Sequence, residues 1–406
     1  MSRSNRRNRR FLTAISPIFS APFLLPALSY RRNGYVLPLL AVSFAFVMFA
    51  FVPPESVDLT RYYQTFDQVE RLKSWSDFQY FLTLFPDSGL YYLMYFCSGL
   101  GLKYQWVVAV IALVSSLALF TIYRHILERS IYERSWKNVF FFFFLLLAVG
   151  LPNLFNASRQ VLVFSLFIFI FYRIYYKQKS NFRGTIFTAS LAIFHFSSLL
   201  FLGIKLANDF FGRRFRKTIM VAMLFSFLFQ FPNLRLDVQS IIATVQTDEV
   251  GAVYEKKVDS YLGEGNNRRL KIVEQEINAN GLLIRYVVKY PAQIAFFILL
   301  LYHRNRFSTL LLITVIGANV FAGFLSVEGR LTNLWHIMLT IELAHMALVN
   351  GRKDVKFAYF AFTPLIVIHL LLFFFKYYES IFGIYGNPMS STSLSTLFMD
   401  VHVKPN

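Results

Sequence analysis

The sequence contains a single cysteine, Cys97, and lacks the short motifs that most often mark metal or nucleotide sites. One cysteine excludes internal disulfides and any cysteine-based metal cluster. We expect Cys97 to be a small buried residue of a helix. No D-x-D, H-E-x-x-H or P-loop pattern occurs in the chain, so we expect the protein to work without a metal ion or another cofactor.

Charged residues are also scarce, at 16% of the 406 residues, whereas 56% of the residues are apolar and 48 are phenylalanines. With a mean hydropathy of +0.48, this composition lies far outside the range of soluble proteins. Apolar runs of about 17 to 25 residues, enough to cross about 30 Å of hydrocarbon, recur without alternating polarity and favour helices over strands. The clearest runs begin near Tyr35, Gln105, Asn138, Arg159, Gly184, Thr218, Leu282, Phe307, Leu331 and Phe357. With two doubtful segments, 11–30 and 80–102, the sequence predicts an all-α polytopic membrane protein with about 10 to 12 transmembrane helices.

The distribution of charge predicts the orientation of these helices. The short loops 173–183, 205–217, 303–306 and 351–356 are rich in Arg and Lys, and basic loops stay on the cytoplasmic side of a membrane. The tail MSRSNRRNRR is expected to be a retained cytoplasmic anchor, because arginines beside a membrane segment are a topology signal far more often than a nucleic-acid site. One conflict follows: the basic loops 173–183 and 205–217 are both expected in the cytoplasm, although they lie at opposite ends of one apparent span. Either the helix around His195 is broken or re-entrant, or one loop departs from the rule.

Five parts are expected along the chain. Residues 1–34 form the basic cytoplasmic N-terminus with a membrane-associated segment, and 35–232 an N-terminal transmembrane bundle that includes an external segment, 53–80. An external loop, 233–281, precedes the C-terminal transmembrane helices, 282–376, and the tail, 377–406. The external loop is long for a plain connection, and two helices, from about 246 to 262 and from about 268 to 279, are expected in it.

Polar residues at the ends of apolar helices, or within them, are the candidate site. A charge at bilayer depth costs at least about 2.5 to 3.5 kcal/mol, so such residues usually face a cavity and serve a function. Two arginines can hold a pyrophosphate bidentately, and a histidine can accept a proton from a sugar hydroxyl. A snorkelling arginine and a packing histidine are the structural alternatives. The set comprises Arg159, Gln160, His195, Arg285, Glu328 and Arg330.

The order of five short segments resembles a known family. An aspartate-bearing segment (VDLTRYYQTFDQ) precedes NASRQ, and IFHFSS follows about 35 residues later; KKVDSYL and EGRLTNLW come last. Over roughly residues 50 to 350 this is similar to the EpsG-like branch of the Wzy-type polysaccharide polymerases. The resemblance implies a GT-C-like glycosyltransferase that polymerises undecaprenyl-pyrophosphate-linked repeat units into O-antigen, capsule or exopolysaccharide. It also implies the bacterial inner membrane, an active site facing the periplasm or outside, and a separate chain-length co-polymerase.

The resemblance also implies roles for single residues. Arg159 would grip the donor pyrophosphate beside Gln160, and Arg330 would be the second cation, with Arg285 as its alternative. His195 is the candidate base and Asp58 its rival, although Asp58 lacks the glycine expected before it. Aromatic side chains could stack on sugars or anchor the protein at the interface; they are Tyr62, Tyr63, Tyr254 and Tyr261.

Two other functions use the same residue types. A flippase or transporter of a lipid-linked sugar would also need intramembrane arginines, but the repeat of hydropathy common in transporters is absent. A membrane acyltransferase would use His195 as the base for a sugar hydroxyl and would take its acyl donor from the cytoplasm. The expected external position of Arg159 does not favour it.

Overall fold

The computed structural model describes residues 24–50, 58–83, 88–149, 158–177, 179–195, 197–212, 214–230, 290–302, 305–322 and 324–352, with residues 363 and 367. Within these ranges the chain is helical and forms no strand; the one β-type contact is an isolated bridge between Tyr30 and Arg134. The all-α prediction is therefore confirmed for the described residues. The chain divides into two compact units, Met1–Leu199 with Leu343–Arg352 and Val367–Asn406, and Leu200–Glu342 with Lys353–Ile366.

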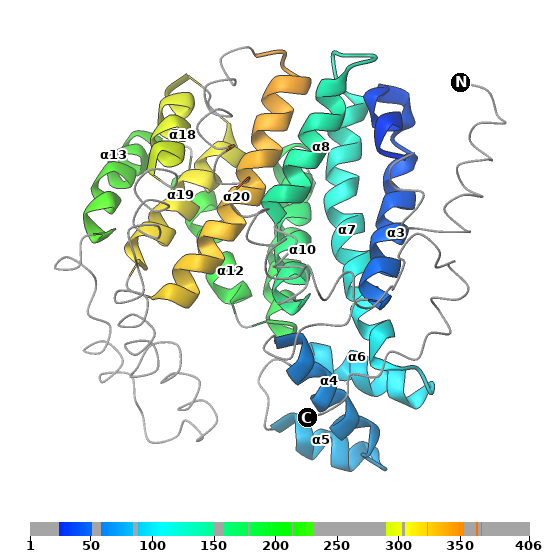
Figure 1. The fold of residues 1–406 in the computed structure, drawn as a ribbon. Coiled ribbons are helices and arrows are strands. Elements are labelled where there is room, and N and C mark those ends of the chain that lie inside the picture. The colour runs from blue at the N-terminus through cyan, green and yellow to red at the C-terminus, as the bar shows by residue number, and fades with distance from the viewer. Residues whose placement is uncertain are drawn as a thin grey trace, which may run out of the picture. The chain divides into compact units, whose positions relative to one another are not determined.

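Unit 1 contains a bundle with a group of short helices at one end (Figure 1). Helix α7 packs against α3 and α10, and α8 contacts α7 through the ring of Phe142 against Phe120 and Tyr123. Two 3₁₀ turns, η1 and η2, precede α3, and η3 follows α11. The bounds are η1 Leu25–Ser29, η2 Arg31–Asn33, α3 Val36–Ala50, α4 Asp58–Glu70, α5 Trp75–Thr83, α6 Gly89–Gly99, α7 Tyr104–Glu128, α8 Trp136–Val149, α10 Ser158–Tyr175, α11 Asn181–Ser190 and η3 Leu191–Ile193.

The length of α7 matters for the membrane. Its 25 residues span about 37 Å at 1.5 Å per residue, more than the hydrocarbon core of a bilayer. Among the described residues α7 is the one helix both long and apolar enough to cross a membrane; three shorter apolar stretches are Val36–Phe46, Trp136–Val149 and Phe307–Val320. The expected number of spans therefore stays a prediction.

The short helices α4, α5 and α6 share one hydrophobic cluster with the start of α7. The cluster includes Phe66 of α4, Phe78 of α5 and Tyr104 of α7. The rings of Phe78 and Tyr95 stack with centroids 4.2 Å apart. The doubtful segment 80–102 thus contains the end of α5 and the 11-residue helix α6, which is too short to cross a bilayer alone.

Unit 2 begins at the third residue of α12, which spans Ser198–Phe211. It also contains α13 Arg216–Ser226, η4 Phe227–Gln230, α18 Tyr290–Tyr302 and α19 Arg306–Val320. Helix α20, Leu325–Leu348, belongs to unit 2 up to Glu342. Asn305 caps α19: its side chain accepts the N–H of Ser308, and its Nδ2 donates to Oε1 of the buried Glu342 over 2.7 Å. Asn319 of α19 connects two other helices of unit 2. Its Nδ2 donates to Ser226 Oγ of α13 over 3.0 Å and to Gln293 Oε1 of α18 over 3.3 Å.

Apolar runs predicted several helix starts closely. Helices α3, α7, α8, α10, α13 and α19 begin within two residues of the expected positions. The sequence prediction was wrong for α20, which begins at Leu325, six residues before Leu331. The N–H of Glu328 already donates to Phe324 O over 2.8 Å. The segment EGRLTNLW is therefore helical throughout, and its glycine is tolerated because one glycine in a helix costs only about 1 kcal/mol. The expected runs at Leu282 and Phe357 begin outside the described residues. Most of the segment 11–30 and the whole loop 233–281 also lie outside them.

Candidate functional site

Arg159 is the second residue of α10 and is bound by Tyr62 of α4, 97 residues earlier. Its Nε donates a hydrogen bond to Tyr62 Oη over 2.8 Å, and its Nη2 donates to the same oxygen. The guanidinium carbon also lies 4.6 Å from the centroid of the Tyr62 ring. A phenol and an aromatic face orient an arginine without neutralising its charge.

The spacing of residues on the two helices explains this contact. Tyr62 shares a face of α4 with Phe66, and Arg159 shares a face of α10 with Leu162. Phe66 and Leu162 are buried members of one hydrophobic cluster, and Tyr62 packs against it. Packing of the apolar positions therefore brings the two polar tips together at the edge of the cluster.

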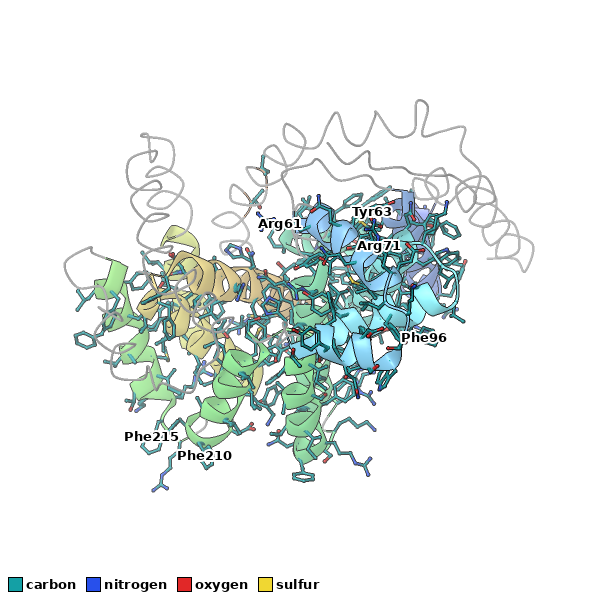
Figure 2. All side chains as sticks on the ribbon, turned by 90° about the horizontal axis from the view of Figure 1, so that it is seen from below. Arg61, Tyr63, Arg71, Phe96, Phe210 and Phe215 are labelled. Carbon is teal, nitrogen blue, oxygen red and sulfur yellow. The ribbon has the colours of Figure 1, made fainter. Side chains whose placement is uncertain are left out.

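The start of α10 adds to the positive potential at Arg159. The first turn of α10 contains no acidic residue, and the N–H groups at a helix start carry about half a unit of positive charge. Gln160 follows Arg159 and is half-buried. Figure 2 views the molecule from the end that carries α4 and labels Arg61, Tyr63 and Arg71 there.

Tyr63 lies beside Tyr62 and packs edge-on against Tyr104, with ring centroids 5.6 Å apart. Burial raises the pKa of the Tyr63 phenol, and the carboxylates of Asp67 and Glu70 raise it further. Tyr63 is therefore a neutral phenol at physiological pH, able to exchange hydrogen bonds with a ligand but unsuited to accept a proton as a phenolate.

His195 lies between η3 and α12, so the helix around it is broken, which is one of the alternatives that the two basic loops left open. The imidazole is 9% exposed. Its Nδ1 accepts the backbone N–H of Ser197 over 3.1 Å and lies 2.9 Å from Ser197 Oγ. A ring nitrogen that accepts an N–H carries no proton, so the neutral imidazole has its proton on Nε2. The basic nitrogen of His195 thus already has a partner within its own turn.

The break is packed against α6 next to the cluster that Tyr62 borders. Phe194 packs on that cluster. A Cβ on Gly89, the first residue of α6, would lie 2.8 Å from Phe194 Cδ1 and 3.0 Å from the carbonyl oxygen of Ile193. Helix α4, the start of α10 and the break before His195 therefore meet around one core.

The remaining predicted site residues are distributed as follows. Asp58 is the first residue of α4, one helical turn before Tyr62. Arg330 lies half-buried in α20 within unit 2, two residues after the buried Glu328. Arg285 and Tyr261, like Tyr254, lie outside the described residues. In the part of the chain that the structure describes, His, Cys, Asp and Glu form no group of three that could hold a metal ion; metal-free chemistry stays a prediction.

Sequence reasoning missed two features. It assigned Tyr62 to sugars and did not pair it with Arg159, because nothing in the sequence links residues so far apart. It also overlooked a polar cluster of unit 2, in which Ser308, Thr309 and Glu342 are buried. Arg216 Nη1 donates to Ser308 Oγ and Thr309 Oγ1, both over 3.1 Å, close to the Asn305–Glu342 bond. A lone carboxylate in the apolar stretch LTIELAH was the signal that could have found Glu342.

The described part of the chain is thus a set of helices that includes the membrane-length α7, with an arginine oriented at the start of the apolar helix α10 as a candidate anion site. The chain belongs to the EpsG family, whose family model matches residues 23–388, nearly the whole chain. This match confirms the resemblance to the EpsG-like branch of the Wzy-type polymerases that the short segments of the sequence indicated. Comparison with curated proteins and with solved structures finds no match.

Proposed function

We propose that the protein polymerises undecaprenyl-pyrophosphate-linked oligosaccharide repeat units into a surface polysaccharide, with Arg159 holding the donor pyrophosphate. The observation that carries the proposal is the contact between Arg159 and Tyr62, which fixes a guanidinium at the start of an apolar helix. A lipid-linked pyrophosphate has its tail in the bilayer and its charge at the interface, where such an arginine can reach it. EpsG-family membership supports a polymerase; the donor and the residue roles are part of the proposal.

In the proposed reaction, a hydroxyl oxygen of the acceptor sugar attacks the anomeric carbon of the growing glycan. The bond from that carbon to the pyrophosphate oxygen breaks, and the electron pair leaves with undecaprenyl pyrophosphate. A preoriented guanidinium stabilises the negative charge that develops on the leaving group. Arg330 or Arg285 would supply a second cation, and Gln160 a hydrogen bond.

A base must take the proton of the attacking hydroxyl. Asp58 and His195 are the two candidates. Because Nδ1 of His195 is occupied by Ser197, whereas Asp58 begins the helix that carries Tyr62, we assign the proton to Asp58 and a positioning role to His195.

The charges along unit 1 support an orientation with this site on the outer face of the inner membrane. The start of α7 packs with α4 near Arg159, whereas the last turn of α7 and the residues that follow it, 124–138, include four arginines and lysines besides two glutamates. By the positive-inside rule the second end is cytoplasmic. A separate chain-length co-polymerase is a further part of this proposal.

The experiment that tests the function is elongation by the purified full-length protein in detergent, supplied with lipid-linked repeat units and read as a size ladder on a gel. Arg159→Ala should abolish elongation, whereas the matched control Arg71→Ala, an exposed arginine just after α4, should retain it. A full ladder from Arg159→Ala would refute the pyrophosphate role. A wild-type protein that moves the lipid-linked glycan across vesicles without lengthening it would be a flippase, and one that acylates the glycan an acyltransferase.

A further inference from the structure

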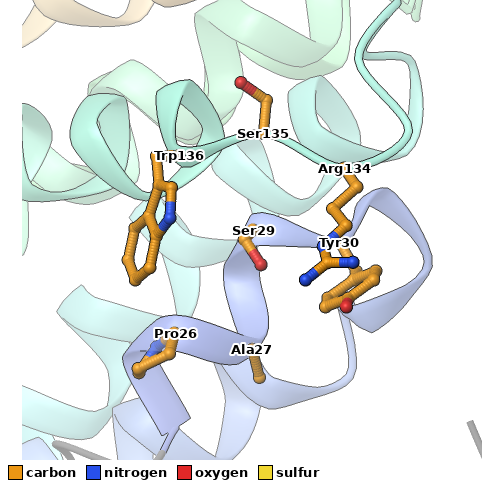
Figure 3. A pocket seen from close by; sticks show the side chains of 7 residues that line it. All are labelled: Pro26, Ala27, Ser29, Tyr30, Arg134, Ser135 and Trp136. Atoms are coloured by element: carbon orange, nitrogen blue, oxygen red, sulfur yellow. The ribbon is translucent and has the colours of Figure 1, made fainter.

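A pocket lies in unit 1 where the turn after α7 packs against η1. Its volume is about 420 Å³, and its lining includes Ser29, Tyr30, Arg134 and Trp136. Figure 3 shows Trp136 on one side and Arg134 with Tyr30 on the other, with Ser29 and Ala27 between them. The residues of the proposed polymerase site, near the start of α7, do not line this pocket.

Hydrogen bonds hold the two walls of the pocket in place. The backbone N–H of Ser135 donates to Ser29 O over 2.9 Å, and the N–H of Arg31 donates to Glu133 O over 3.0 Å. The fully buried Asn138 also donates from Nδ2 to Ser29 O over 3.0 Å. The pocket is therefore built into the fold and does not depend on the position of one loose side chain.

Arg134 brings a positive charge to the pocket, and the ring of Tyr30 orients this charge. The guanidinium of Arg134 lies over the ring of Tyr30, 5.0 Å from its centroid. The adjacent carboxylate of Glu133 pairs with Arg32, at 3.5 Å. Residues 24–36 and 124–138 together hold six Arg and Lys residues and two Glu, so an anion would enter a positive field.

An exposed apolar stripe runs away from the pocket along α8. Trp136, Phe140 and Phe143 follow one another at i, i+4 and i+7, and are 69%, 49% and 42% exposed. Residues at this spacing lie on one face of a helix. A ligand with a charged head and an apolar tail would match a cationic pocket that continues into such a stripe.

We propose that this pocket binds the phosphodiester headgroup of an anionic phospholipid, with Arg134 on the phosphate and an acyl chain along Trp136, Phe140 and Phe143. A planar guanidinium binds phosphate oxygens bidentately, and tryptophan is favoured at the level of lipid headgroups. Basic pockets at the cytoplasmic ends of helices are suited to anionic lipid headgroups. A free phosphate would satisfy Arg134 alone and would have no use for the stripe.

The test measures phospholipid retained by the full-length protein after purification from nanodiscs of equal parts phosphatidylglycerol and phosphatidylcholine, by native mass spectrometry. Arg134→Ala should lower retained phosphatidylglycerol about tenfold, as expected for a lost hydrogen bond to a charged group. Lys137→Ala is the matched control, because Lys137 donates to Tyr132 Oη over 2.9 Å and does not line the pocket. Lys137→Ala should lower the retained phosphatidylglycerol only a few-fold, the contribution of any single cation near an anionic surface. Equal losses in the two variants would overturn the proposal.

A second measurement uses the wild-type chain and so does not depend on a variant that folds. Phosphatidylglycerol with a photoreactive acyl chain should crosslink to peptides that contain residues 136–143, and crosslinks confined to other segments would overturn the proposal. Inorganic phosphate at millimolar concentration should leave this crosslinking unchanged. If phosphate abolishes it, the pocket is a site for soluble phosphate and the lipid assignment is wrong.

Discussion

At the scale of single residues, the Arg159–Tyr62 pair shows how a chain fixes a guanidinium at the start of an apolar helix. A long, flexible side chain loses entropy when it is ordered, and that cost falls on ligand binding unless the protein orders it beforehand. Tyr62 orders Arg159 through a hydrogen bond at 2.8 Å and through its ring. Tyr62 is then a positioning residue, in addition to the sugar contact expected from the sequence.

This role predicts a graded response at position 62. Tyr62→Phe keeps the ring and removes the oxygen that accepts from Nε and Nη2 of Arg159, so elongation should fall at least about tenfold, the effect of a lost hydrogen bond to a charged group. The elongation rate of Tyr62→Leu should fall further, because this variant also loses the cation–π contact. The measurement is the initial rate of elongation by purified protein. Tyr80→Phe, at a tyrosine that is 74% exposed on α5, is the control; unchanged activity of Tyr62→Phe would contradict the role.

The proton acceptor is the second question at this scale. Asp58→Asn should lower the elongation rate at least about 100-fold, the usual contribution of a general base. His195→Asn should stay within a few-fold of wild type, because an asparagine oxygen can also accept the N–H of Ser197. The elongation rates of both variants are measured as a function of pH. The fall in the wild-type rate at acidic pH, where the base is protonated, should be absent in Asp58→Asn. A 100-fold loss in His195→Asn with an active Asp58→Asn would reverse the assignment.

At the scale of helices, the approach of α6 to the break before His195 depends on a glycine. Gly89→Ala would place a methyl group 3.0 Å from the Ile193 carbonyl, a backbone atom that cannot turn aside. Overpacking of this kind costs about 1 to 3 kcal/mol, so the unfolding midpoint in detergent should fall. Gly99→Ala, at the other end of α6, meets no atom within 4 Å and should leave the midpoint unchanged. Equal midpoints for the two variants would show that the break can move away.

The same scale shows what could be predicted from the sequence. Starts of helices such as α7 and α10 follow from apolar runs bounded by polar residues, since each helix satisfies its own backbone. The start of α20 was misplaced because Glu328 and Arg330 read as the edge of a span, although they lie within the helix. The candidate arginine at 159 was also visible as a charge at a helix end. Its partner Tyr62 was not, because the pairing of α4 with α10 arises from tertiary packing.

At the scale of the whole molecule, α7 connects two chemically different ends of unit 1. Tyr104, its first residue, belongs to the cluster beside the Arg159–Tyr62 pair, whereas Arg124 near its last turn forms an ion pair with Glu128 over 2.7 Å. The helix is about 37 Å long, so the two ends are separated by more than the hydrocarbon thickness. A protein arranged in this way can take a lipid-borne pyrophosphate at one surface and contact anionic headgroups at the other.

This arrangement predicts that the two ends label from opposite sides of the membrane. In a Cys97→Ala background, Gln68→Cys on α4 and Glu133→Cys in the turn after α7 introduce single thiols at exposed positions. Both replaced residues are neutral or acidic, so neither change removes a charge that sets orientation. A membrane-impermeant maleimide added to intact spheroplasts should label Gln68→Cys alone, and detergent should expose Glu133→Cys. Labelling of both thiols before detergent would mean that α7 does not cross the bilayer, and labelling of Glu133→Cys alone would place Arg159 on the cytoplasmic side, where the proposed polymerase could not meet its donor.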